Sequence, residues 1–167
     1  IEIALKAMSA KDVRDPWWVP VPYDLGAFPK RAALTISPDG MPVAKDVEAA
    51  LRDAAQRLKD AGWIVDEVPC PSMTLAAKIN EQLWLTEMRA GADKLVEQEA
   101  ETDSQFVYQQ MNNRVEPVGV DGVLGALQAR AGVVREWEEF MQKYPVLICP
   151  VSGELPFSQQ QDMQSEA

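Results

Sequence analysis

Hydrophobic and polar positions change their period twice within residues 31–71, and this change predicts a strand, a helix and a second strand. Residues 32–36 form a short apolar run with β-branched members, followed by a Ser-Pro-Asp-Gly turn, which suits a buried strand. Apolar residues then recur every three or four positions over residues 43–61, which places them on one helical face. Residues 63–68 supply the second strand. This order favours a right-handed crossover between parallel strands.

Both ends of the predicted helix carry sequence signals. Pro42 stands where a first helical position is expected, and Gly62 stands where a helix is stopped. Asp46 lies near the start and Arg57 near the end, the order that complements the helix dipole. The apolar face needs a sheet or another helix to cover it, because burying one leucine side chain is worth roughly 1.5 to 3 kcal/mol.

The remaining pattern is mainly helical. It predicts a short helix at residues 1–8, mostly helix over 73–99, a shorter helix over 104–115 and a long helix over 120–144. A buried strand is expected over residues 145–151. The last helix is expected to face inward with its large apolar residues, which are Leu124, Leu127, Val134, Trp137 and Met141.

These elements predict an α/β fold in which several long helices accompany the strand-helix-strand unit. A chain of 167 residues can bury one sizeable core, so we expect a single domain over residues 1–156. The polar tail, residues 157–167, is expected to be disordered. The chain begins at Ile1 rather than at a methionine, and we therefore expect it to be a segment of a longer protein.

Composition excludes several classes of function. The net charge of −10 and the absence of a run of basic residues argue against a nucleic-acid partner. No apolar segment approaches the roughly 18 residues that cross a bilayer, so we expect no membrane contact. Cys70 and Cys149 lie far apart in apolar, proline-flanked settings, which favours reduced thiols over a disulfide and therefore a cytoplasmic location.

The sequence contains no histidine, and this excludes more chemistry than any other count. Ser-His-Asp and Cys-His nucleophile systems and the usual histidine-containing zinc sites cannot be built from this chain alone. Two acidic pairs, Asp12 with Asp15 and Asp66 with Glu67, have no evident partner for general acid-base work, although Arg14 is expected to pair with Asp12 or Asp15. We therefore predict no catalytic residue, no metal ligand and no cofactor site in the chain.

The order of segments resembles the central to C-terminal part of the amidase signature family. Residues 31–36, the Ala-rich helix ending in Ala54-Ala55-x-x-Leu58-x-x-Ala61-Gly62, and the strand that follows are similar to a strand, helix and strand of that family. The later helix and the strand that ends at Pro150 are also similar. The resemblance extends to about Pro156, and it lacks the family's Gly-Gly-Ser-Ser-Gly stretch.

The resemblance implies that the chain is part of a larger mixed-sheet α/β/α fold. It also implies a hydrolase that cleaves carboxamide bonds with a Ser nucleophile, a second Ser in a cis peptide and a Lys. None of the seven serines or eight lysines here lies in such a context, so this Ser-Ser-Lys mechanism is expected outside the chain. The alternative is a non-catalytic α/β binding or interaction module, such as an inactive amidase-like subunit.

Residues of this chain are therefore expected only to line a pocket for a small-molecule amide. Ligands of α/β sheets sit beyond the carboxyl ends of the strands, where Val151, Ser152, Gly153 and Glu154 are placed. Trp84 and Met88 are candidates for an apolar wall. An ordinary loop and plain core packing are the alternative interpretations of these two sets. Uncovered apolar faces and sheet edges would favour association, so a homo-oligomer is an expected partner state.

Overall fold

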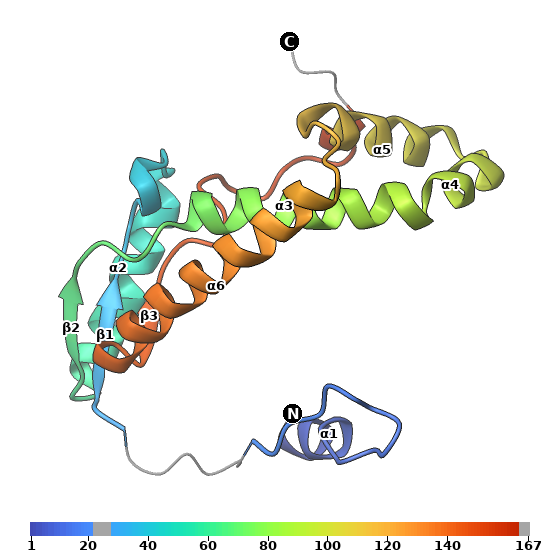
Figure 1. The fold of residues 1–167 in the computed structure, drawn as a ribbon. Helices are drawn as coiled ribbons and strands as arrows, with labels where there is room; N and C mark the ends of the chain where they lie inside the picture. Colours follow the sequence, from blue (N-terminus) through green and yellow to red (C-terminus); the bar gives the residue numbers. More distant parts are fainter. Residues whose placement is uncertain (22–27, 164–167) are drawn as a thin grey trace.

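The computed structural model describes residues 1–21 and 28–163 (Figure 1). Along the chain the helices, strands and 3-10 turns follow in the order α1 (Glu2–Met8), β1 (Arg31–Leu34), η1 (Pro38–Gly40), α2 (Lys45–Asp60), β2 (Ile64–Glu67), α3 (Met73–Gly91), α4 (Asp93–Glu99), α5 (Thr102–Arg114), α6 (Val120–Lys143), β3 (Val146–Ile148) and η2 (Gln161–Met163). Among these described residues, none of the helices combines the length and the apolar character that a membrane crossing requires.

Three parallel strands form a small sheet in the order β2-β1-β3. The central strand pairs on both sides, with Ala32 in register with Val65 of β2 and Val146 of β3. Its Ala32, Ala33 and Leu34 are buried, as expected for a strand covered on both faces. The parallel sheet and its helices confirm the predicted α/β class.

Helix α2 connects β1 to β2 and begins later than the sequence pattern predicts. Its first residue is Lys45, three positions after Pro42, because the Ala44 N–H donates to the carbonyl oxygen of Gly153 at 2.7 Å and holds the preceding segment extended. The predicted stop is correct. Gly62 has a φ of +82°, a left-handed conformation that favours glycine, and its N–H donates to the Lys59 carbonyl.

The two long helices, α3 and α6, pack against each other (Figure 1). The predicted helix over 73–99 is divided into α3 and α4. The prediction that the large apolar residues of α6 face inward is wrong for Leu124, Leu127, Val134 and Met141, which are 41% to 51% exposed. The buried residue of α6 is the small Ala126. The apolar positions of α6 therefore occupy more than one face, and only one of these faces meets α3.

The ends of the chain contribute little to this core. Helix α1 has no buried residue, and Figure 1 shows it apart from the sheet and the long helices. At the other end of the chain, η2 lies against α5. The structure describes the predicted tail as far as Met163, the last residue of η2. Residues 164–167 lie outside the described residues, and the domain boundary at residue 156 stays a prediction.

Candidate functional site

Three segments meet at the carboxyl edge of the sheet, where α/β proteins usually bind ligands. Backbone pairing continues past the strands, because the Thr35 N–H donates to the Ile148 carbonyl at 2.9 Å and the Val68 N–H donates to the Leu34 carbonyl at 3.0 Å. The Thr35 hydroxyl also donates to the Val68 carbonyl at 2.7 Å. The segments after β1, β2 and β3 are therefore fixed relative to one another.

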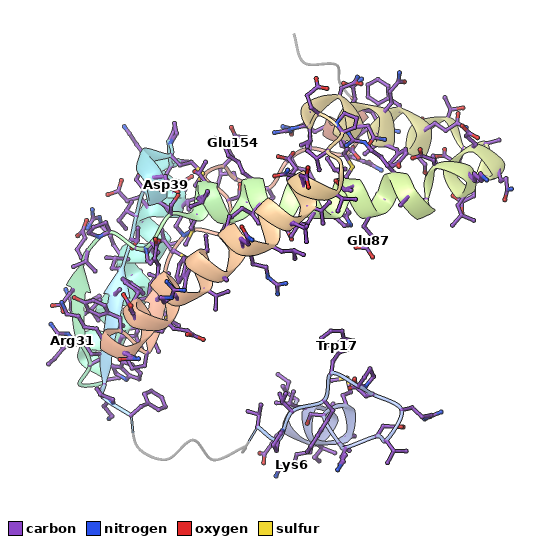
Figure 2. All side chains as sticks on the ribbon, viewed as in Figure 1. Lys6, Trp17, Arg31, Asp39, Glu87 and Glu154 are labelled. Atoms are coloured by element: carbon purple, nitrogen blue, oxygen red, sulfur yellow. The ribbon has the colours of Figure 1, made fainter. Side chains whose placement is uncertain are left out.

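Asp39 joins this edge to the start of α3. Figure 2 shows it at the end of the sheet opposite Arg31. Its backbone is in the left-handed region with a φ of +51°, and its carboxylate accepts the Thr74 N–H at 2.7 Å. This bond to a free N–H of the first helical turn lowers the pKa of Asp39 below its ordinary value. Ser72 accepts the Leu75 N–H, so two side chains cap α3.

We expect the D39N variant to have a lower Tm than the natural protein at pH 7, because a neutral amide oxygen is a weaker acceptor at a helix N-terminus. The folded-state pKa of Asp39 is depressed. Its stabilisation is therefore complete above the unfolded-state pKa and is lost as the pH falls through the folded-state pKa, below about pH 4. Thermal unfolding followed by circular dichroism should show a Tm gap that narrows from pH 7 to pH 3. Asparagine also tolerates the left-handed backbone, so a gap that is constant with pH would contradict the proposed cause.

The loop after β3 is closed onto the segment before α2. Gly153 is buried, and a β-carbon added to it would lie 2.3 Å from the Pro42 carbonyl oxygen. Val151 is exposed to solvent. Ser152 is exposed too, and its hydroxyl accepts the Glu154 N–H at 3.2 Å within the same turn. The structure thus places Val151, Ser152 and Gly153 at the predicted edge. Their role in lining a substrate pocket stays a prediction.

Cys70 and Cys149 flank the same edge, one after β2 and the other after β3. Both are half-buried free thiols. Burial raises the pKa of each thiol, and the nearby Thr35 hydroxyl opposes this effect only at Cys70. Since the thiolate is the nucleophilic form, these cysteines are poorly suited to nucleophilic catalysis at neutral pH.

Arginines hold three members of the acidic pairs singled out from the sequence, which are Asp12, Asp66 and Glu67. Arg31 binds Asp66 with a closest N···O distance of 2.6 Å, and Arg14 binds Asp12 at the same distance. The second pair confirms the expected partner of Arg14. Each arginine, through its side-chain hydrogen bonds, lowers the pKa of the aspartate that it contacts. These carboxylates are therefore ionised partners of salt bridges, which does not suit a general acid.

Trp84 and Met88, the predicted apolar wall, lie in different environments. Trp84 is 46% exposed on α3. Met88 is half-buried and lines a cavity of about 560 Å³ together with Met111 of α5 and Met163 of η2. Met88 is fifteen residues along α3 from its first residue, about 22 Å at the rise of a helix. Met88 therefore lies far along α3 from the start of that helix, where Asp39 joins it to the edge of the sheet.

A second cavity, which we call the α3–α6 groove, lies between the two long helices and was not predicted. It has a volume of about 390 Å³ and is lined by Ala76, Ile79, Asn80, Leu83, Arg130 and Val133. No local feature of the sequence distinguishes its lining residues, because the groove forms only where the two helices pack together. Within the described part of the chain, no group of three or more Cys, Asp or Glu residues could hold a metal ion.

Comparison with known proteins gives consistent matches. The family model described as Amidase matches residues 1–167. The chain is 32% identical over 155 residues to an indoleacetamide hydrolase of Bradyrhizobium diazoefficiens, covering 91% of this chain and 29% of that protein. It is 33% identical over 161 residues to an indoleacetamide hydrolase of Bradyrhizobium japonicum, covering 91% of this chain and 33% of that protein. The chain therefore spans about a third or less of the length of these relatives.

Proposed function

Because this chain belongs to the amidase family, we propose that it is a segment of an enzyme that hydrolyses the carbon–nitrogen bond of carboxamides. The match to the family over residues 1–167 is the observation that carries this proposal. The two relatives named indoleacetamide hydrolase support a small arylacetamide as the first substrate to test. In such a reaction water adds to the acyl carbon, the carbon–nitrogen bond breaks, and nitrogen leaves as ammonia.

The Ser-Ser-Lys machinery of this proposal lies outside the 167 residues. Three features of the chain support that placement. The sequence has no histidine to activate a serine. Its two thiols have pKa values raised by burial. One aspartate of each acidic pair, Asp12 in the first and Asp66 in the second, is bound to an arginine. The role of this chain is then structural, with a small parallel sheet and two long helices that support and border a substrate site.

The test measures ammonia release from indole-3-acetamide by the protein in its full natural reading frame. We expect turnover that is abolished by replacing a serine outside residues 1–167, and no turnover by the 167-residue chain alone. Hydrolysis by the 167-residue chain that survives replacement of all seven of its serines would overturn the placement of the nucleophile. A full-length protein that hydrolyses none of a panel of aryl and alkyl amides would instead favour a non-catalytic, amidase-like binding module.

A further inference from the structure

The α3–α6 groove has an apolar floor and two polar groups at its rim. Ile79 is buried, while Leu83 and Val133 are half-buried and Ala76 contributes only a methyl group. Asn80 of α3 and Arg130 of α6 are exposed and come from the two facing helices. The volume of about 390 Å³ falls within the range of roughly 300 to 1,000 Å³ typical of small-molecule sites.

Arg130 differs from most arginines of this acidic chain. Arg14, Arg31, Arg52, Arg57 and Arg114 each form an ion pair, and Arg89 donates to the carbonyls of Asn112 and Val115. Within residues 1–21 and 28–163, no carboxylate forms an ion pair with Arg130. The positions one turn away on α6 are Ala126, Leu127, Val133 and Val134, which offer no charge.

An unpaired guanidinium at the rim of an apolar cavity suits one kind of ligand. Its planar donors match a carboxylate and bind it with two parallel hydrogen bonds. The Asn80 amide can donate to the same group from the facing helix, and the apolar floor suits a ring or a hydrocarbon chain. A net charge of −10 on the chain would repel anions at most surfaces, so a carboxylate site requires a local cation of this kind.

We propose that the α3–α6 groove binds an apolar carboxylic acid in its ionised form, with the carboxylate against Arg130 and the ring over Ile79, Leu83 and Val133. The choice of acid rests on the proposed function, because hydrolysis of an arylacetamide yields ammonia and an arylacetate with this combination of groups. The groove is then a site for the product of the reaction, and indole-3-acetate is the probe.

The test is equilibrium dialysis of indole-3-acetate against the protein in its full natural length, with the R130Q variant. We expect R130Q to raise the Kd of indole-3-acetate for the groove by about tenfold or more. The reason is that a charge-assisted hydrogen bond to a partly enclosed carboxylate is lost. R135Q is the matched control, since Arg135 is an exposed arginine of the same helix that does not line the groove. It should change the Kd by less than about twofold, because exposed charges are screened by salt.

A neutral analogue separates recognition of the charge from recognition of the ring. Indole-3-ethanol should bind the natural protein and R130Q with equal affinity. If R130Q and R135Q lose the same affinity for indole-3-acetate, the effect is a general attraction of anions and the proposal is overturned. An unchanged Kd in R130Q would overturn it too.

Binding and turnover also separate this proposal from the proposed function. If the natural protein hydrolyses no amide but binds indole-3-acetate, and R130Q loses that binding, the carboxylate site in the groove is supported and the proposed amide hydrolysis is rejected. If the protein turns over indole-3-acetamide fully and R130Q leaves the binding of indole-3-acetate unchanged, the proposed hydrolysis is supported and the carboxylate site is rejected.

Discussion

The G153A variant should be destabilised by about 2 kcal/mol or more. The added β-carbon would lie 2.3 Å from the Pro42 carbonyl oxygen, and this neighbour is backbone that cannot rotate away. Relief requires the loop after β3 to move from the segment before α2, which weakens the 2.7 Å bond from the Ala44 N–H to the Gly153 carbonyl. Urea unfolding followed by far-ultraviolet circular dichroism measures the loss as a lower midpoint.

The same substitution elsewhere in the chain gives the control. A β-carbon added to Gly125 of α6 would meet nothing within 4 Å. Since alanine favours a helix over glycine, G125A should be stabilised by about 0.5 to 1 kcal/mol. If G153A were as stable as the natural protein, the loop at the carboxyl edge would not be closed onto Pro42, and a pocket bordered by Val151 and Ser152 would become the better interpretation.

Local patterns predicted the strand-helix-strand unit well, because each of its signals acts within a few residues. The change of period separates strand from helix, and the positive φ of Gly62 ends the helix where glycine is needed. The start of α2 was misplaced for the opposite reason. Ala44 is held by Gly153, more than a hundred residues further along the chain, and no feature near Pro42 reports that contact.

The candidate site was predicted less completely, because it depends on distances between elements. Met88 and the loop at Val151 were both reasonable lining residues, yet α3 is one continuous helix that carries Met88 away from the sheet. Arg130 had no distinguishing local signal, since an arginine on a long amphipathic helix is ordinarily solvated. Its relation to Asn80 and the apolar floor exists only once α3 and α6 pack together.

The L85A variant should lose about 2 to 5 kcal/mol of stability, the usual cost of truncating a buried leucine. Leu85 is 1% exposed, the largest fully buried side chain within the described residues. It lies two positions beyond Leu83, so it points to the side of α3 away from the groove. Helix α3 is thus buried on two sides. Urea unfolding of L85A measures how much burial of the side that carries Leu85 contributes to the stability of the protein.

Leu95 offers the comparison, because it is 60% exposed and L95A should change stability by less than about 0.5 kcal/mol. Since Leu85 does not line the groove, folded L85A should retain the affinity of the natural protein for indole-3-acetate. A large loss of stability with unchanged binding would show that the two faces of α3 have separate roles, one in packing and one in recognition. A parallel loss of both would mean that packing at Leu85 sets the spacing of α3 and α6, and with it the position of Asn80 relative to Arg130.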